Sequence, residues 1–63
     1  MIKVFRIYAE KESRPYFLRL TRYDKNKIIS FCKEKGLTGK IMVEYPIKNG
    51  AHQVYKTKFI KID

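Results

Sequence analysis

Cations and aromatic side chains alternate at two places in the chain. Arg6 and Tyr8 stand two residues apart, and so do Phe17 and Arg19. Residues two apart point to the same face of a β-strand, so each pair would present a charge beside a ring. Unpaired bases stack on aromatic rings, while Lys and Arg neutralise the phosphates that join them. The spacing therefore predicts a surface that binds single-stranded nucleic acid.

Three further cations extend this predicted surface. Arg22 lies just ahead of an expected helix, whose first N–H groups form a natural phosphate site. Lys56 and Lys58 share one face of the last expected strand and would flank the bases as phosphate contacts. Each has a structural alternative, since Arg22 suits a solvated helix end and lysines on an edge strand deter unwanted pairing. The predicted nucleic-acid-binding residues are Arg6, Tyr8, Phe17, Arg19, Arg22, Lys56 and Lys58.

Charge and composition support an anionic partner. The 63 residues include 15 Lys and Arg against six Asp and Glu, a formal net charge of +9. A positive field this strong on a small body attracts polyanions. The hydrophobic fraction of 44% is too high for a disordered tail, and the four Phe and five Tyr are too many for so small a core to enclose. We therefore expect rings at the surface and a nucleic acid, single-stranded or RNA rather than duplex, or a ribonucleoprotein, as partner.

Two alternatives remain open at this stage. Tyr8 and Phe17 could pair across neighbouring strands, or the exposed rings could form the interface of a homodimer. In a different class of function, a small accessory protein of the phage, virus or plasmid type modulates a host protein. Its basic surface would then dock on an acidic protein groove.

The residues that usually carry catalysis are isolated here. His52 has no second His or Cys at metal-ligand spacing, and Cys32 lies on the apolar stripe of the expected helix. The carboxylates are scattered along the chain. We therefore predict that the protein is not an enzyme and has no metal site and no cofactor. A lone cysteine and the lack of a long apolar segment or signal-peptide core favour the cytoplasm and argue against a membrane.

Hydrophobic periodicity predicts one α+β domain spanning residues 1–63. Strands are expected at 2–9, 16–21, 40–47 and 52–62, with a helix within 22–36. The order β-β-α-β-β favours a small antiparallel sheet with one helix packed on one face. The other face would then meet solvent or a partner.

Local signals mark the ends of these elements. Asp24 either completes a capping box that begins at Thr21 or is itself the N-cap, and Gly36 suits the position just after the helix. Asn49 and Gly50 predict a hairpin turn, and Pro46 marks a strand end or an edge position. The alternation of residues 52–62 slips, which predicts a bulge or burial on both faces near the end.

Overall fold

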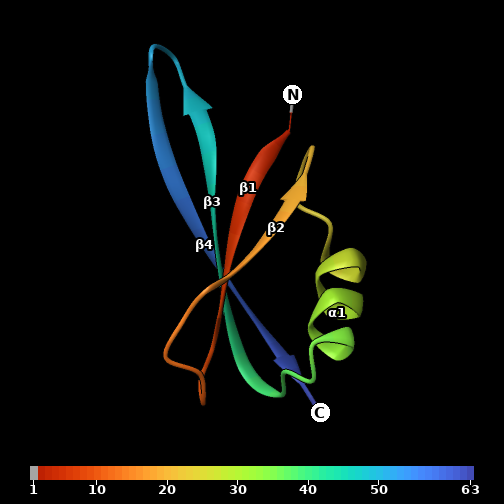
Figure 1. Ribbon diagram of the computed structural model, residues 1–63. Helices are drawn as coiled ribbons and strands as arrows, with labels where there is room; N and C mark the ends of the chain where they lie inside the picture. The colour runs from red at the N-terminus through yellow and green to blue at the C-terminus, as the bar shows by residue number, and fades with distance from the viewer. Residues whose placement is uncertain (1) are drawn as a thin grey trace.

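The computed structural model describes residues 2–63, which form a four-stranded antiparallel sheet and one helix (Figure 1). The elements follow one another as β1 Lys3–Ala9, β2 Tyr16–Leu20, α1 Lys25–Glu34, β3 Gly39–Asn49 and β4 His52–Ile62. In space the strands lie in the order β2-β1-β3-β4. The predicted α+β class and the order β-β-α-β-β are therefore confirmed.

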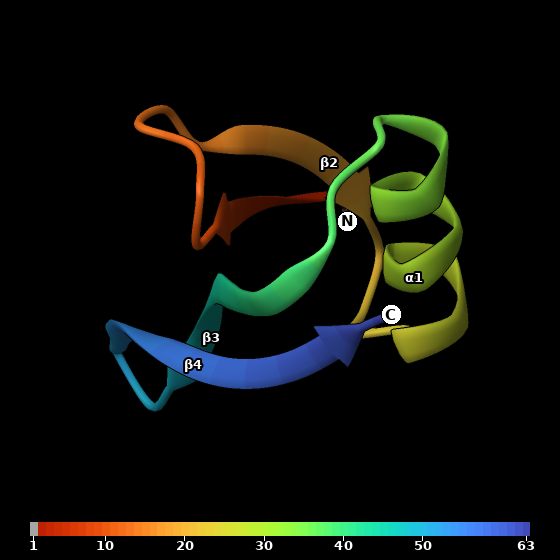
Figure 2. The same cartoon turned by 90° about the horizontal axis from the view of Figure 1, so that it is seen from below.

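The sheet has a single covered face, and β2 and β4 form its two edges. Seen from below, these edge strands lie on opposite sides of the central pair, with α1 to one side of the sheet (Figure 2). The buried residues of the strands alternate with exposed ones, as expected when one face is packed and the other is open. The packed face carries Phe5, Ile7, Ala9, Ile41, Val43, Tyr45, Ile60 and Ile62.

The helix is shorter than the segment predicted to contain it. It begins after Asp24, whose backbone is extended (φ −139°, ψ 102°) and whose carboxylate accepts a hydrogen bond from the N–H of Lys27 at 3.2 Å. Of the two predicted caps, Asp24 is therefore the N-cap itself. Ile28 and Cys32, one turn apart, are fully buried against the sheet.

The helix ends at Glu34 with Lys35 as its C-cap, and Gly36 is the residue just after it, as predicted. This residue has φ +73°, a left-handed conformation that only glycine adopts without strain. The N–H of Gly36 donates to the carbonyl of Lys33 at 3.1 Å, and the N–H of Leu37 donates to that of Cys32 at 2.8 Å. This pair of bonds is a Schellman motif, and it turns Leu37 into the core, where 2% of its surface is exposed.

Three aromatic rings stack on the covered face. The Phe5 and Tyr45 rings lie 4.8 Å apart between centroids, and Tyr23 stacks on the other side of Tyr45 at 5.4 Å. Tyr23 comes from the segment just before α1, so the stack joins the helix entry to the two central strands. Phe5 and Tyr45 are buried and Tyr23 is partly buried, so the stack belongs to the packing of the covered face.

The β3–β4 hairpin corrects two details of the sequence interpretation. Its register is continuous from Gly39 opposite Ile62 to Asn49 opposite His52, so β4 contains no bulge. Nor is the end of β4 buried on both faces, since Phe59 and Lys61 are exposed. The slipped alternation instead reflects exposure, because α1 covers only the end of β4 that carries Ile60 and Ile62. The turn itself is displaced by one residue from the predicted pair, since Gly50 (φ +65°) and the following residue form the loop.

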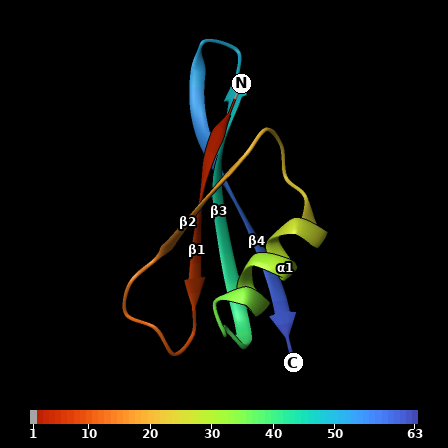
Figure 3. The same ribbon diagram turned by 45° about the vertical axis from the view of Figure 1, so that its right-hand side comes forward.

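The far half of this hairpin extends away from the helix. Figures 1 and 3 both show α1 beside one end of the sheet and the hairpin tip at the other. β1 pairs with β3 only from Arg6–Glu44 to Ala9–Ile41, and beyond that point the two strands diverge (Figure 1). Pro46 lies beyond the last β1 pair, where β3 is bordered by β4 alone, so its predicted edge position is confirmed.

Candidate nucleic-acid interface

The sheet face opposite α1, called the open face below, gathers cations and rings from all four strands. Its members follow from the buried alternation and from the register, because residues directly opposite in an antiparallel pair share a face. The rings on it are Tyr8, Phe17, Tyr55 and Phe59, and the cations are Arg6, Arg19, Lys40, Lys48 and Lys61.

The charge on this face is strongly unbalanced. Against those five cations, Glu44 is the one carboxylate that the strands place there within residues 2–63. Glu44 is already paired, since its Oε1 accepts a hydrogen bond from Nη1 of Arg6 at 3.1 Å. That bond raises the pKa of Arg6, whose guanidinium keeps its charge throughout the usual pH range. The remaining cations are free to meet an anion.

Two rings on the open face lie beneath cations. The Arg6 guanidinium carbon is 5.6 Å from the centroid of the Tyr55 ring, and the Lys40 Nζ is 4.9 Å from that of Phe59. Tyr55 and Phe59 each expose more than half of their residue surface. Cation–π contacts of this kind hold a ring and a charge side by side at the surface. The arrangement thus places an exposed aromatic ring and a positive charge next to each other.

Four of the seven predicted residues share this face. Arg6 and Phe17 lie directly opposite each other on β1 and β2, and Arg19 lies opposite Val4. Tyr8 is half-buried and lies opposite Met42 of β3. Because Phe17 faces Arg6, the alternative in which Tyr8 and Phe17 form a directly opposed cross-strand pair is not what the structure shows.

The other three predicted residues lie elsewhere. Lys56 and Lys58 do share a face, as expected, but it is the helix side of the sheet, opposite Tyr45 and Val43. The Nζ of Lys58 lies 5.5 Å from the centroid of the Tyr23 ring.

Arg22 is exposed in the connection from β2 to α1. Together with Thr21, Asp24 and Lys27, it borders a shallow depression at the start of the helix. It therefore belongs to the helix entry and not to the open face.

Sequence reasoning did not single out the open-face residues of the β3–β4 hairpin. The predicted binding residues include neither the rings Tyr55 and Phe59 nor the cations Lys40 and Lys48. A usable signal was present, because the turn near Gly50 and the alternation of residues 40–47 together fix the hairpin register. That register would have put Tyr55 and Phe59 on the open face and the pair Lys56 and Lys58 on the other.

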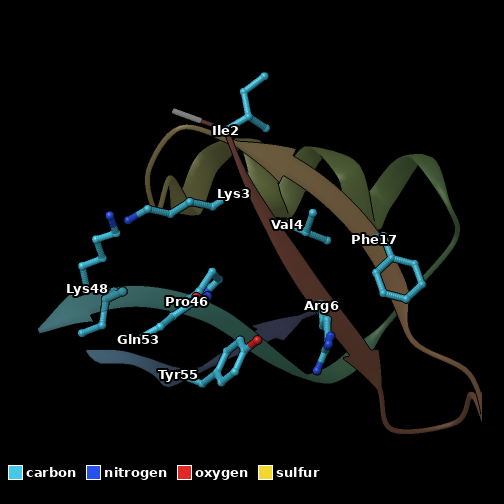
Figure 4. A pocket seen from close by; sticks show the side chains of 10 residues that line it. Ile2, Lys3, Val4, Arg6, Phe17, Pro46, Lys48, Gln53 and Tyr55 are labelled. Atoms are coloured by element: carbon cyan, nitrogen blue, oxygen red, sulfur yellow. The ribbon is translucent and has the colours of Figure 1, made fainter. Parts of the chain in front are cut away.

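A groove of about 450 Å³ lies in the open face where β1 and β3 diverge (Figure 4). Its volume falls within the range of small-molecule sites, roughly 300–1,000 Å³. The residues that line it come from β1, β2 and the β3–β4 hairpin: Ile2, Lys3, Val4, Arg6, Phe17, Pro46, Ile47, Lys48, Gln53 and Tyr55.

Two further side chains, Cys32 and His52, are potentially reactive. Cys32 is fully buried between α1 and the sheet, and this burial raises the pKa of its thiol, so the reactive thiolate forms less readily. His52 is exposed at the start of β4. Among the described residues, no three His, Cys, Asp or Glu side chains cluster closely enough to hold a metal ion. Across the same residues, α1 is too short and too polar to span a bilayer.

Comparison with known proteins gave no relative: no family model, no curated protein and no solved structure matches this chain. The functional argument therefore depends on the residues of the open face alone.

Proposed function

We propose that the protein binds single-stranded nucleic acid, RNA or DNA, through the open face of its sheet. The observation that carries this proposal is the co-location of four rings with five cations and one already paired carboxylate on an uncovered sheet face. Rings buried in the fold would not support it. Here Phe17, Tyr55 and Phe59 each expose more than half of their surface.

Binding would divide between charge and stacking. Arg19, Lys40, Lys48 and Lys61 contact phosphates and release counterions, so affinity falls as salt concentration rises. The exposed rings stack on bases, each contributing about 1–3 kcal/mol. Because stacking on the rings of the open face requires bases that are not already paired, single strands bind more tightly than duplex.

A fluorescence polarisation titration tests the proposal. Labelled single-stranded RNA, single-stranded DNA and a duplex of the same sequence are titrated at about 50 and 200 mM salt, the range over which phosphate contacts lose most affinity. We expect the single strands to bind in the micromolar range or tighter, the duplex to bind less tightly, and all affinities to fall with salt.

Variants locate the binding to the open face. Arg19→Ala should weaken binding, whereas Lys33→Ala, which removes an exposed cation from the last turn of α1, is the charge-matched control. Equal losses of affinity in both variants would mean that binding depends on net charge alone and not on the open face. No binding of any polynucleotide at 50 mM salt would refute the proposal.

A second candidate is an accessory protein that docks on an acidic host protein. The observation in its favour is the outer edge of β4, eleven residues long, which has no neighbouring strand among the described residues. Such an edge can add a strand from a partner. Pull-down from a host lysate with and without nuclease separates the two functions, since a partner that survives nuclease treatment is bound through protein.

Self-association is a weaker explanation of the exposed rings. Two copies that met through the open face would bring their unpaired cations together, and like charges oppose such contact. Light scattering after size exclusion, at low and high salt, measures the oligomeric state.

A further inference from the structure

The groove in the open face exists because two central strands stop pairing. If the β1–β3 register continued beyond Arg6–Glu44, Val4 would lie opposite Pro46 and Ile2 opposite Lys48. Instead the strands separate, and these same residues line the groove. By alternation, Lys3 and Ile47 belong to the helix side of the sheet, yet both also line the groove. The groove therefore extends into the space between β1 and β3.

Different parts of the groove have different chemistry. Val4 and Pro46 give it an apolar middle, and Phe17 and Tyr55 supply rings from the strands on either side. Arg6 closes the end where β1 and β3 begin to pair. In Figure 4 its side chain lies between those of Phe17 and Tyr55, in agreement with its position opposite Phe17 and its 5.6 Å contact with the Tyr55 ring.

Apart from Ile2, the residues at the open end of the groove are polar or positively charged. Lys3, Lys48 and Gln53 line it there, and no carboxylate is among the residues that border it within the described chain. The occupant that complements this distribution has a flat apolar body, hydrogen-bonding groups on its edge and negative charge beside it. A nucleotide has all three properties, because its base is planar, its base edge carries donors and acceptors, and its phosphate is anionic.

We propose that the groove holds one base of a single-stranded polynucleotide, flipped out of the strand's own stack. The base lies on the apolar middle beside Phe17 and Tyr55. The Gln53 amide, which both donates and accepts, reads the base edge. Lys3 and Lys48 contact the phosphates on either side. This inference rests on the proposed function. It assigns the contact that distinguishes one base from another to the groove.

Mononucleotides probe the groove directly, because they are too short to span the open face. Adenosine and uridine monophosphates are titrated up to about 10 mM into the ¹⁵N-labelled protein, and amide shifts are followed by NMR. We expect shifts to concentrate at Val4, Arg6, Gln53 and Tyr55. Tyr55→Ala and Phe17→Ala should each weaken mononucleotide binding about 5- to 150-fold, the range found for loss of one stacked base.

Phe59→Ala is the matched control. Phe59 is an exposed ring on the same face, 61% accessible, but it lies opposite Met42 and outside the groove. Its loss should leave mononucleotide affinity unchanged while weakening a single-stranded decanucleotide. Circular dichroism of each variant establishes that it is folded.

Three results would overturn the groove assignment. These are the absence of mononucleotide shifts at 10 mM, shifts centred on Phe59 and Lys40, or wild-type mononucleotide affinity in both groove variants. Equal or tighter binding of a short poly-glutamate peptide at the same residues would likewise assign the groove to an acidic protein segment. In all of these cases, salt-sensitive binding of the decanucleotide would leave the proposed function intact, whereas its absence would remove both.

Discussion

The two faces of the sheet use the same aromatic residues in different ways. On the covered face the rings of Phe5 and Tyr23 each stack on Tyr45, and Phe5 and Tyr45 are buried while Tyr23 is partly buried. On the open face Tyr55 and Phe59 lie beneath cations and remain exposed. The neighbours of a ring, and not its type, thus decide whether it stabilises the fold or is available to a partner.

The largest difference between the faces should appear in stability. Phe5→Ala removes a fully buried ring and should cost about 3–5 kcal/mol, comparable with the whole stability of so small a domain. Phe59→Ala should change the free energy of unfolding by no more than about 0.5 kcal/mol. Urea denaturation followed by circular dichroism measures both. Similar losses in the two variants would mean that the open-face ring also belongs to the fold.

The salt dependence of binding should separate the lysines of the two faces. Lys40 and Lys61 are directly opposite each other on the open face, whereas Lys56 and Lys58 lie on the helix side. Each lost phosphate contact reduces the slope of log affinity against log salt by about 0.7 for a single strand. The double variant Lys40→Ala/Lys61→Ala should therefore lower the slope by about 1.4.

The double variant Lys56→Ala/Lys58→Ala carries the same change in net charge and serves as its control. Its slope should stay close to that of the wild type. If it instead falls by as much as that of Lys40→Ala/Lys61→Ala, the nucleic acid wraps around the edge strand and contacts both faces.

Alkaline pH should lower the free energy of unfolding, because Cys32 is buried on the covered side of the sheet. Burial raises the pKa of this thiol above its unfolded value of about 8.5. As pH rises past that value, the unfolded chain releases the proton while the folded chain keeps it, so the free energy of unfolding falls. The slope can reach at most about 1.4 kcal/mol per pH unit.

Urea denaturation between pH 7.5 and 9.5 measures this slope. Cys32→Ala should flatten it, whereas the open-face variant Tyr55→Ala should not. The range ends below the titration of Tyr23, whose pKa burial also raises. An unchanged slope in Cys32→Ala would assign the alkaline loss to another group.

The smallest effect should come from the single carboxylate of the open face. Glu44→Gln removes a negative charge that holds Arg6, with little loss of stability because the pair is solvent-accessible. Affinity for a single strand should rise about two- to fivefold, which corresponds to the worth of one exposed ion pair. Weaker binding would mean instead that Glu44 positions Arg6 for its contact with the ligand.

Much of the fold followed from alternation and local signals. The apolar residues of β1 and β3 identified the covered face, and Gly36 and Asp24 marked the helix ends. The candidate site was only half predictable, because the face on which β4 places its lysines depends on pairing with β3. Residues 52–59 are exposed, so the hydrophobic pattern of this segment does not indicate which of its sides faces the helix.

The groove could not have been predicted from any single segment. It depends on how far β1 and β3 remain paired, and the pairing stops at Arg6–Glu44 although both strands continue. In the sequence, Val4 is typical of an ordinary strand residue, and Pro46 indicates only a strand end or an edge position. Only the three-dimensional register shows that they would be opposite neighbours if the strands had stayed together.

The hairpin tip around Gly50 is a suitable site for inserting new sequence. It lies beyond the helix and outside the packed interior, so residues grafted between β3 and β4 would extend the protein without disturbing its hydrophobic centre (Figure 3). A library of tip sequences displayed on this scaffold could vary ligand preference while the rest of the chain keeps its shape.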